Sequence, residues 1–167
     1  MTVLRDFAAF ALDVAQRAGA SILPHFRAAV TVDDKGGEGG YDPVTEADRA
    51  AERVIRDAIL ARFPDHGIEG EEHGRLAGRS RYTWVIDPID GTRSFILGQL
   101  HWGTLIALHD GTRPIVGVMH QPYVGESFVA VNGQAEWRRG DASRALHVRP
   151  CATLDAAIVA TTDPRHF

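Results

Sequence analysis

The stretch Tyr82-Thr83-Trp84-Val85-Ile86-Asp87-Pro88 marks the point at which the chain changes from helical to strand periodicity. Its apolar and β-branched residues are consecutive and stop at Asp87-Pro88, which is typical of a buried strand. Before it, apolar side chains recur at helical spacing over residues 3–26 and 45–63, and they predict two helices. Pro24 is expected to kink the first helix near its end.

Three further apolar, β-branched runs follow, separated or ended by turn signals. The runs are Thr104–Leu108, Ile115–Met119 and Ser127–Val131, and the turn signals are Asp110-Gly111, Gln121-Pro122-Tyr123 and Asn132-Gly133. This alternation predicts an antiparallel meander. Residues 156–162 are expected to form one more strand, and residues 32–40, which hold four glycines in five positions, a mobile loop. The predicted fold class is therefore α+β, with two helices packed on an antiparallel sheet.

Composition excludes several classes of function. The 167 residues are 44% hydrophobic, and 18 Lys and Arg stand against 22 Asp and Glu. An acidic balance without a basic run argues against binding to nucleic acid or to an anionic membrane. The single Cys151 cannot form an internal disulfide, and no run reaches the roughly 18 apolar residues of a membrane span. Residues 7–12 lack the basic flank of an export signal, so a cytoplasmic protein is expected.

The strongest chemical signal is Asp87-Pro88-Ile89-Asp90-Gly91-Thr92, directly after the first predicted strand. Two carboxylates across this bend can converge on one hard cation such as Mg²⁺. A helix over residues 92–96 would direct its first N–H groups at an anion. A cation beside N–H donors predicts a phosphate-ester site. The same residues are also good turn chemistry, so a plain solvated turn is the alternative.

Two acidic clusters precede this bend. Asp42-Pro43-Val44-Thr45-Glu46-Ala47-Asp48 opens the second helix, where Thr45 and Asp48 fit a capping box. Gly70-Glu71-Glu72 follows the short apolar pair Gly67-Ile68. Each cluster also has a structural interpretation, as a helix cap and as a solvated surface, respectively.

Together the segments 42–48, 70–72 and 84–92 resemble the signatures of the inositol-monophosphatase family of Mg²⁺-dependent phosphatases. Arg93-Ser94-Phe95, Trp102-Gly103-Thr104 and residues 160–164 resemble its histidinol-phosphate phosphatase branch. The resemblance implies the N-terminal half of an αβαβα sandwich.

The resemblance also implies roles for individual residues. Metal ligands would be Glu71, Asp87, Asp90 and the carbonyl of Ile89. Asp48 and Thr92 would position and deprotonate the attacking water. The backbone of Gly91 and Thr92 would hold the phosphate. Lys35 corresponds to a loop lysine of the family, and Arg93 would meet the phosphate or the polar end of the substrate, a plain salt bridge being equally compatible.

One signature of the family, Trp-Asp-x-Ala, does not occur, because Trp137 is followed by Arg138-Arg139. Residues 1–150 are therefore interpreted as a metal- and phosphate-binding domain, and residues 151–167 as the start of a second domain. The metal site would then lack one ligand.

Three functions stay open after this comparison of motifs. The expected function is Mg²⁺-dependent hydrolysis of a small phosphorylated metabolite, L-histidinol phosphate, as in histidine biosynthesis. The alternatives are an inositol-1-phosphate or nucleotide bisphosphate phosphatase, and a non-catalytic metal- or phosphate-binding fragment that acts by association. A homodimer is a further expectation from the family.

Overall fold

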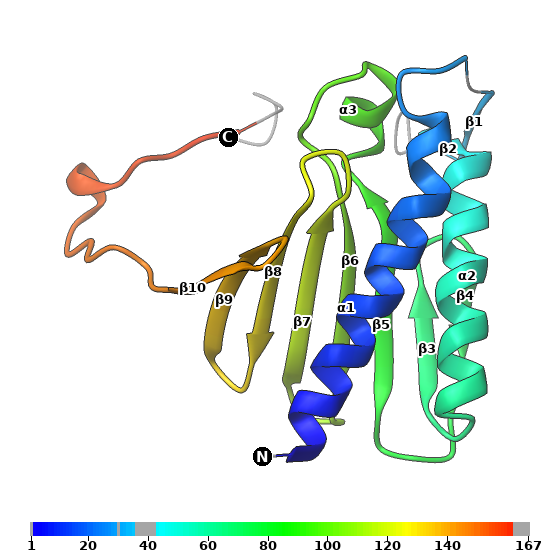
Figure 1. Cartoon of the computed structure of the whole chain (residues 1–167), viewed down its shortest axis with the longest axis horizontal. Coiled ribbons are helices and arrows are strands. Elements are labelled where there is room, and N and C mark those ends of the chain that lie inside the picture. The colour runs from blue at the N-terminus through cyan, green and yellow to red at the C-terminus, as the bar shows by residue number, and fades with distance from the viewer. Residues whose placement is uncertain (1, 30, 36–42, 162–167) are drawn as a thin grey trace.

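Two long helices lie on one face of an eight-stranded sheet (Figure 1). The computed structural model describes residues 2–29, 31–35 and 43–161. In chain order its elements are α1 Thr2–Ile22, η1 Leu23–His25, β1 Val32–Asp34, β2 Pro43–Thr45, α2 Glu46–Arg62, β3 Gly67–Gly70, β4 Gly74–Leu76, β5 Thr83–Asp90, α3 Thr92–Ile96, β6 Gly103–His109, β7 Pro114–Gln121, β8 Glu126–Val131, β9 Gln134–Arg139, β10 Ala142–Leu146 and η2 Leu154–Ala156. The predicted α+β class is confirmed.

Both predicted helices form, and their ends have local causes. α1 stops at Ile22 and passes into the 3₁₀ turn η1 because Pro24 has no N–H to continue the α-helical ladder. α2 begins after Thr45, whose hydroxyl accepts the Asp48 N–H while the Asp48 carboxylate accepts the Thr45 N–H. The predicted capping box is thus confirmed. The helix ends at Arg62, before the Pro64–Gly67 stop signal.

The sheet has the strand order β10-β9-β8-β7-β6-β5-β3-β4. All neighbouring strands are antiparallel except β3 and β5, which run parallel. The predicted meander forms β6, β7 and β8, and Asn132 and Gly133 turn the chain into β9 with φ of 46° and 83°. Such positive φ at both positions is the signature of a tight hairpin turn.

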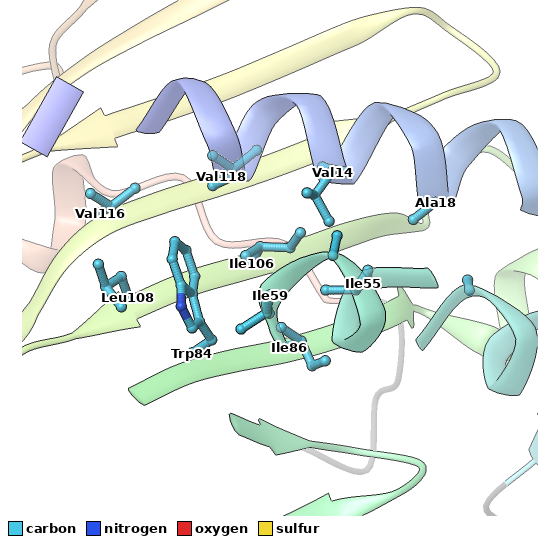
Figure 2. Close-up of a cluster of buried hydrophobic side chains, with 14 of the residues drawn as sticks. Val14, Ala18, Ile55, Ile59, Trp84, Ile86, Ile106, Leu108, Val116 and Val118 are labelled. Atoms are coloured by element: carbon cyan, nitrogen blue, oxygen red, sulfur yellow. The ribbon is translucent and has the colours of Figure 1, made fainter. Parts of the chain in front are cut away.

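One hydrophobic core lies between the helix layer and the sheet (Figure 2). It contains Val14 and Ala18 of α1, Ile55 and Ile59 of α2, and Trp84, Ile86, Ile106, Leu108, Val116 and Val118 of the strands. On each strand the core residues alternate with residues of the opposite face, as the period of two requires. That opposite face carries a groove of about 650 Å³ with apolar residues such as Leu105 and Met119, and with Glu71 and Asp87 in its lining.

The predicted strand over residues 156–162 is wrong for its described part. Residues 157–161 have no regular structure, and Ile158 and Val159 are 84% and 67% exposed. A strand needs a neighbour to pair its backbone, and no strand of the described chain lies beside this segment. The predicted loop over 32–40 is wrong at its start, because residues 32–34 form β1 and pair with β2, and its residues 36–40 lie outside the described residues. Within the described ranges, no helix combines the length and apolar character that crossing a bilayer requires.

Candidate active site

The end of β5, the turn between β3 and β4, the start of α2 and the start of α3 meet at one end of the sheet (Figure 1). Because β3 and β5 are parallel neighbours, both strands end on the same side of the sheet, with Gly70 opposite Ile86. The next residues, Glu71 and Asp87, are therefore neighbours. The Glu71 N–H donates to the Ile86 carbonyl oxygen at 3.2 Å.

The carboxyl groups of Glu71 and Asp87 form the electrostatic centre of the site. Burial, the charge and hydrogen bonding of Glu71, and to a smaller extent Asp90 raise the pKa of Asp87 to about 8. Asp87 Oδ1 is buried without a hydrogen-bond partner in the described chain. Two negatively charged carboxylates that lie next to each other repel. Such a pair is therefore stabilised when it shares a proton or binds a cation.

These oxygens fit a hard divalent cation. Mg²⁺ in enzymes is usually held by one or two carboxylates together with waters and substrate phosphate. Glu71 and Asp87 supply two carboxylates, and the buried Asp87 Oδ1 has a free acceptor position. Over the described ranges, no three His, Cys, Asp or Glu side chains are close enough together to hold a metal ion. The arrangement therefore offers a two-carboxylate site open to further oxygen ligands.

The two other predicted ligands, Asp90 and Ile89, follow Asp87 on the last residues of β5, and the described structure does not gather Glu71, Asp87 and Asp90 into one group of metal-binding side chains. Asp90 is exposed at the end of β5, and its charge contributes to the raised pKa of Asp87. The Ile89 carbonyl oxygen accepts a hydrogen bond from Thr92 Oγ1 at 3.0 Å, while the Ile89 side chain is buried in the core. Their assignment as metal ligands stays a prediction.

Lys35 lies against the turn of residues 71–73 between β3 and β4, which is called the acidic turn below. Its Nζ is 2.8 Å from Glu72 Oε1 and 3.4 Å from Glu71 Oε1. Burial raises the pKa of the Glu72 carboxyl, and the hydrogen bond from Lys35 opposes that shift. Lys35 therefore offsets negative charge at the turn, beside the predicted ligand Glu71.

Asp48 and Thr92 lie within reach of each other across the site. Thr92 Oγ1 is 3.4 Å from Asp48 Oδ1. The other oxygen, Asp48 Oδ2, accepts hydrogen bonds from the N–H of Thr45, at 2.9 Å, and from its hydroxyl. Asp48 is 1% exposed, and this burial raises the pKa of its carboxyl above the ordinary value. The helix cap thus holds one oxygen of Asp48 and leaves the other beside Thr92.

The bend between β5 and α3 depends on Gly91. Gly91 has φ of 88°, and a Cβ there would overlap the His101 carbonyl oxygen. Phe95 anchors the single turn of α3. Its side chain is buried and packs edge-on against Trp102, with 5.0 Å between the two ring centroids. The N–H groups of a first helical turn have no partner within the helix, so the Gly91–Thr92 backbone suits an anion. Arg93 is exposed on α3.

Glu52 and Arg56 lie on α2 behind the acidic turn and belong to none of the three sequence motifs. Glu52 is fully buried and hydrogen-bonds to Arg56 and to the backbone of Glu72 and His73. The available signal was a charged residue four positions after Asp48, within the helical stripe that contains Ile55 and Ile59. The prediction at Asp42 lies outside the described residues.

Comparison with known proteins identifies the family of the chain. Residues 3–166 match the model of the inositol monophosphatase family. The chain is 39% identical over 168 residues to the bifunctional phosphatase IMPL2 of Arabidopsis thaliana, covering 99% of this chain and 47% of the relative. It is 38% identical over 158 residues to a histidinol-phosphatase of Chlorobaculum parvum, covering 94% of this chain and 59% of the relative.

A solved structure of an inositol monophosphatase has a similar fold. An inositol monophosphatase from Zymomonas mobilis superposes with a TM-score of 0.73 at 38% identity, over 90% of this chain and 56% of that structure. The chain thus spans about half the length of the curated relatives it matches. Since the family model covers nearly all of the chain and the fold agrees, the chain belongs to the inositol monophosphatase family.

Proposed function

We propose that this chain carries catalytic and metal-binding residues of a Mg²⁺-dependent phosphomonoesterase that acts on a small phosphate ester. The observation that carries the proposal is the pairing of Glu71 with Asp87, beside the linked side chains of Asp48 and Thr92. Family membership supports it, because the matched relatives include phosphatases. An oxygen-only, two-carboxylate site next to backbone N–H donors suits phosphoryl transfer, which depends mainly on positioning and charge stabilisation.

The residues of the chain divide the work between binding and proton transfer. Glu71 and Asp87, together with Asp90 and the Ile89 carbonyl, would hold the cation. When bound, Mg²⁺ supplies positive charge that offsets the charge of a phosphoryl group and favours loss of a proton from water. The N–H groups of Gly91 and Thr92 orient phosphoryl oxygens.

Proton transfer falls to Thr92 and Asp48 in this proposal. Thr92 Oγ1 orients the attacking water, and Asp48 Oδ1 lies 3.4 Å from that hydroxyl. Because burial raises the pKa of Asp48, its carboxylate accepts a proton more readily than an exposed aspartate does.

The substrate we propose is L-histidinol phosphate, hydrolysed to histidinol and phosphate. Support comes from Arg93-Ser94-Phe95 after the Gly91-Thr92 bend and from the histidinol-phosphatase of C. parvum among the relatives. Arg93 on α3 would meet the phosphate or the polar end of this substrate. The second candidate is inositol 1-phosphate, which the similarity to the Z. mobilis inositol monophosphatase favours.

Phosphate release with Mg²⁺ tests both the activity and the substrate. L-histidinol phosphate and inositol 1-phosphate are offered side by side to the wild-type chain, to Asp90→Asn and to the control Asp57→Asn, whose site is exposed on α2. We expect preference for L-histidinol phosphate and a loss of at least about tenfold in Asp90→Asn alone. Preference for inositol 1-phosphate would contradict the substrate, and an unimpaired Asp90→Asn would contradict the mechanism. Cation binding without turnover of either ester would favour a purely binding role.

A further inference from the structure

Glu52 is a fully buried carboxylate that the proposed chemistry does not use. It lies on α2 at 0% exposure, directly behind the turn that carries Glu71. Its Oε2 accepts the Glu72 N–H at 2.7 Å, and its Oε1 accepts the His73 N–H at 3.1 Å. Burying a charge is costly unless it is paired and hydrogen-bonded. Here the compensation comes from the backbone of the acidic turn, from one arginine, and from the His73 imidazole, whose Nδ1 is 3.4 Å from Glu52 Oε1.

That arginine is Arg56, one helical turn further along α2. Its Nε donates to Glu52 Oε1 at 2.7 Å, and its Nη2 donates to the Gly74 carbonyl oxygen. The pair therefore contacts the turn at two places, at the N–H groups of residues 72 and 73 and at the carbonyl of residue 74. A hydrogen bond to a charged group is about twice as strong as a neutral one, so α2 holds this turn firmly.

Gly70 shows how closely Glu52 approaches the chain. A Cβ at Gly70 would overlap Glu52 Oε1 and lie 2.6 Å from its Cδ. Only glycine lets the strand end pass this close to the carboxylate. The Glu71 backbone is consequently fixed on both sides, by its own N–H to the Ile86 carbonyl and by the two following N–H groups to Glu52.

We infer that Glu52 is a positioning residue, which holds the backbone of the Glu71 turn so that the Glu71 carboxylate stays beside Asp87 for a divalent cation. The inference rests on the proposed function, because it assigns Glu71 to cation binding. Glu52 touches neither the cation nor the substrate in this account. Its effect passes through two backbone N–H groups, and it belongs to the outer residues whose loss commonly weakens a metal site about 10- to 100-fold.

The test compares Glu52→Gln with Asp57→Asn, which removes one negative charge from the exposed face of the same helix. Hydrogen exchange measures the amides of Glu72 and His73, and electron paramagnetic resonance measures the affinity for Mn²⁺. In Glu52→Gln we expect both amides to exchange at least about tenfold faster and the Kd for Mn²⁺ to rise at least about tenfold. The amides of Ile55 and Ile59, two buried residues of α2, serve to report whether the helix is still folded. Asp57→Asn should match the wild type in every measurement.

Gly70→Ala reaches the same carboxylate from the other side and is expected to weaken Mn²⁺ binding in the same way. It also decides the outcome if Glu52→Gln does not fold. Unchanged exchange at Glu72 and His73, or faster exchange with Mn²⁺ affinity within twofold of wild type, would overturn the inference and leave the proposed function intact. Failure of the wild-type chain to bind Mn²⁺ would contradict both, and the wild-type titration alone would show it.

Discussion

At the scale of the residue, the Asp87 carboxyl lies in an environment that destabilises its ionised form. Burial and Glu71 raise its pKa to about 8, so its contribution to stability is complete below its ordinary pKa near 4 and is lost as the pH rises through about 8. Without divalent cations, Asp87→Asn should therefore be more stable than wild type at pH 8.5 by about 1–3 kcal/mol, a value reduced because Asp87 is only partly buried. Near pH 4 the two should be alike.

Urea unfolding in EDTA at both pH values measures this difference. The comparison reports on the Asp87–Glu71 pair, because the substitution removes the Asp87 carboxyl together with its interaction with Glu71 and leaves the other side chains the same. An advantage of Asp87→Asn that is the same at pH 4 and pH 8.5 would show that the carboxyl is not under electrostatic strain.

Gly91 allows a second prediction at this scale. Gly91→Ala combines a positive φ with an overlap on the His101 carbonyl, whereas Gly133→Ala has a similar φ of 83° and open space around its Cβ. We expect Gly133→Ala to cost about 1 kcal/mol and Gly91→Ala at least about 2 kcal/mol more, from thermal unfolding. Equal losses would mean that the bend at Gly91 can relax.

At the scale of the element, the start of α2 joins helix stability to the site. Thr45→Ala removes the hydroxyl that caps the helix and also contacts Asp48 Oδ2. We expect a loss of about 1 kcal/mol in the free energy of unfolding, which Thr45→Ser should largely avoid because it keeps the hydroxyl. A Thr45→Ser variant as unstable as Thr45→Ala would assign the effect to the lost methyl group rather than to the cap.

The long elements were predictable from the sequence because their apolar period is sustained. The capping box at Thr45 and Asp48 placed the start of α2 correctly. β5 was predicted to stop at Asp87-Pro88 but continues to Asp90, since the register between β5 and β6 shifts after Asp87 and accommodates Pro88 without its N–H. The strands β3, β4, β9 and β10 are short or polar and carry no apolar run that would reveal them.

The candidate site was predictable as residue types but not as a geometry. The motifs identified Glu71 and Asp87 as candidates, yet their proximity follows from the parallel pairing of β3 with β5, which no local pattern in the sequence predicts. Glu52 was missed for a related reason, because its contacts are to the backbone of a turn 20 residues away in sequence.

At the scale of the whole molecule, the helix layer and the sheet share one core, and the opposite sheet face lies outside it. Two neighbours on β6 test this division: Ile106 is 2% exposed beneath the helices, and Leu105 lines the groove on the other face. Ile106→Ala should cost about 3–4 kcal/mol, and Leu105→Ala less than about 1.5 kcal/mol, in urea unfolding of the chain. Similar losses for the two variants would show that both faces contribute equally to the core.

The central claim is that Glu71 and Asp87 hold a divalent cation where a phosphate ester can meet it. Calorimetric titration of Mg²⁺ into the wild-type chain, Glu71→Gln, Asp87→Asn and the control Asp57→Asn tests it most directly. The account predicts one saturable site in wild type and in Asp57→Asn, with affinity reduced at least about tenfold in each of the other two variants. Equal affinity in all four proteins, or no binding by the wild type, would contradict it.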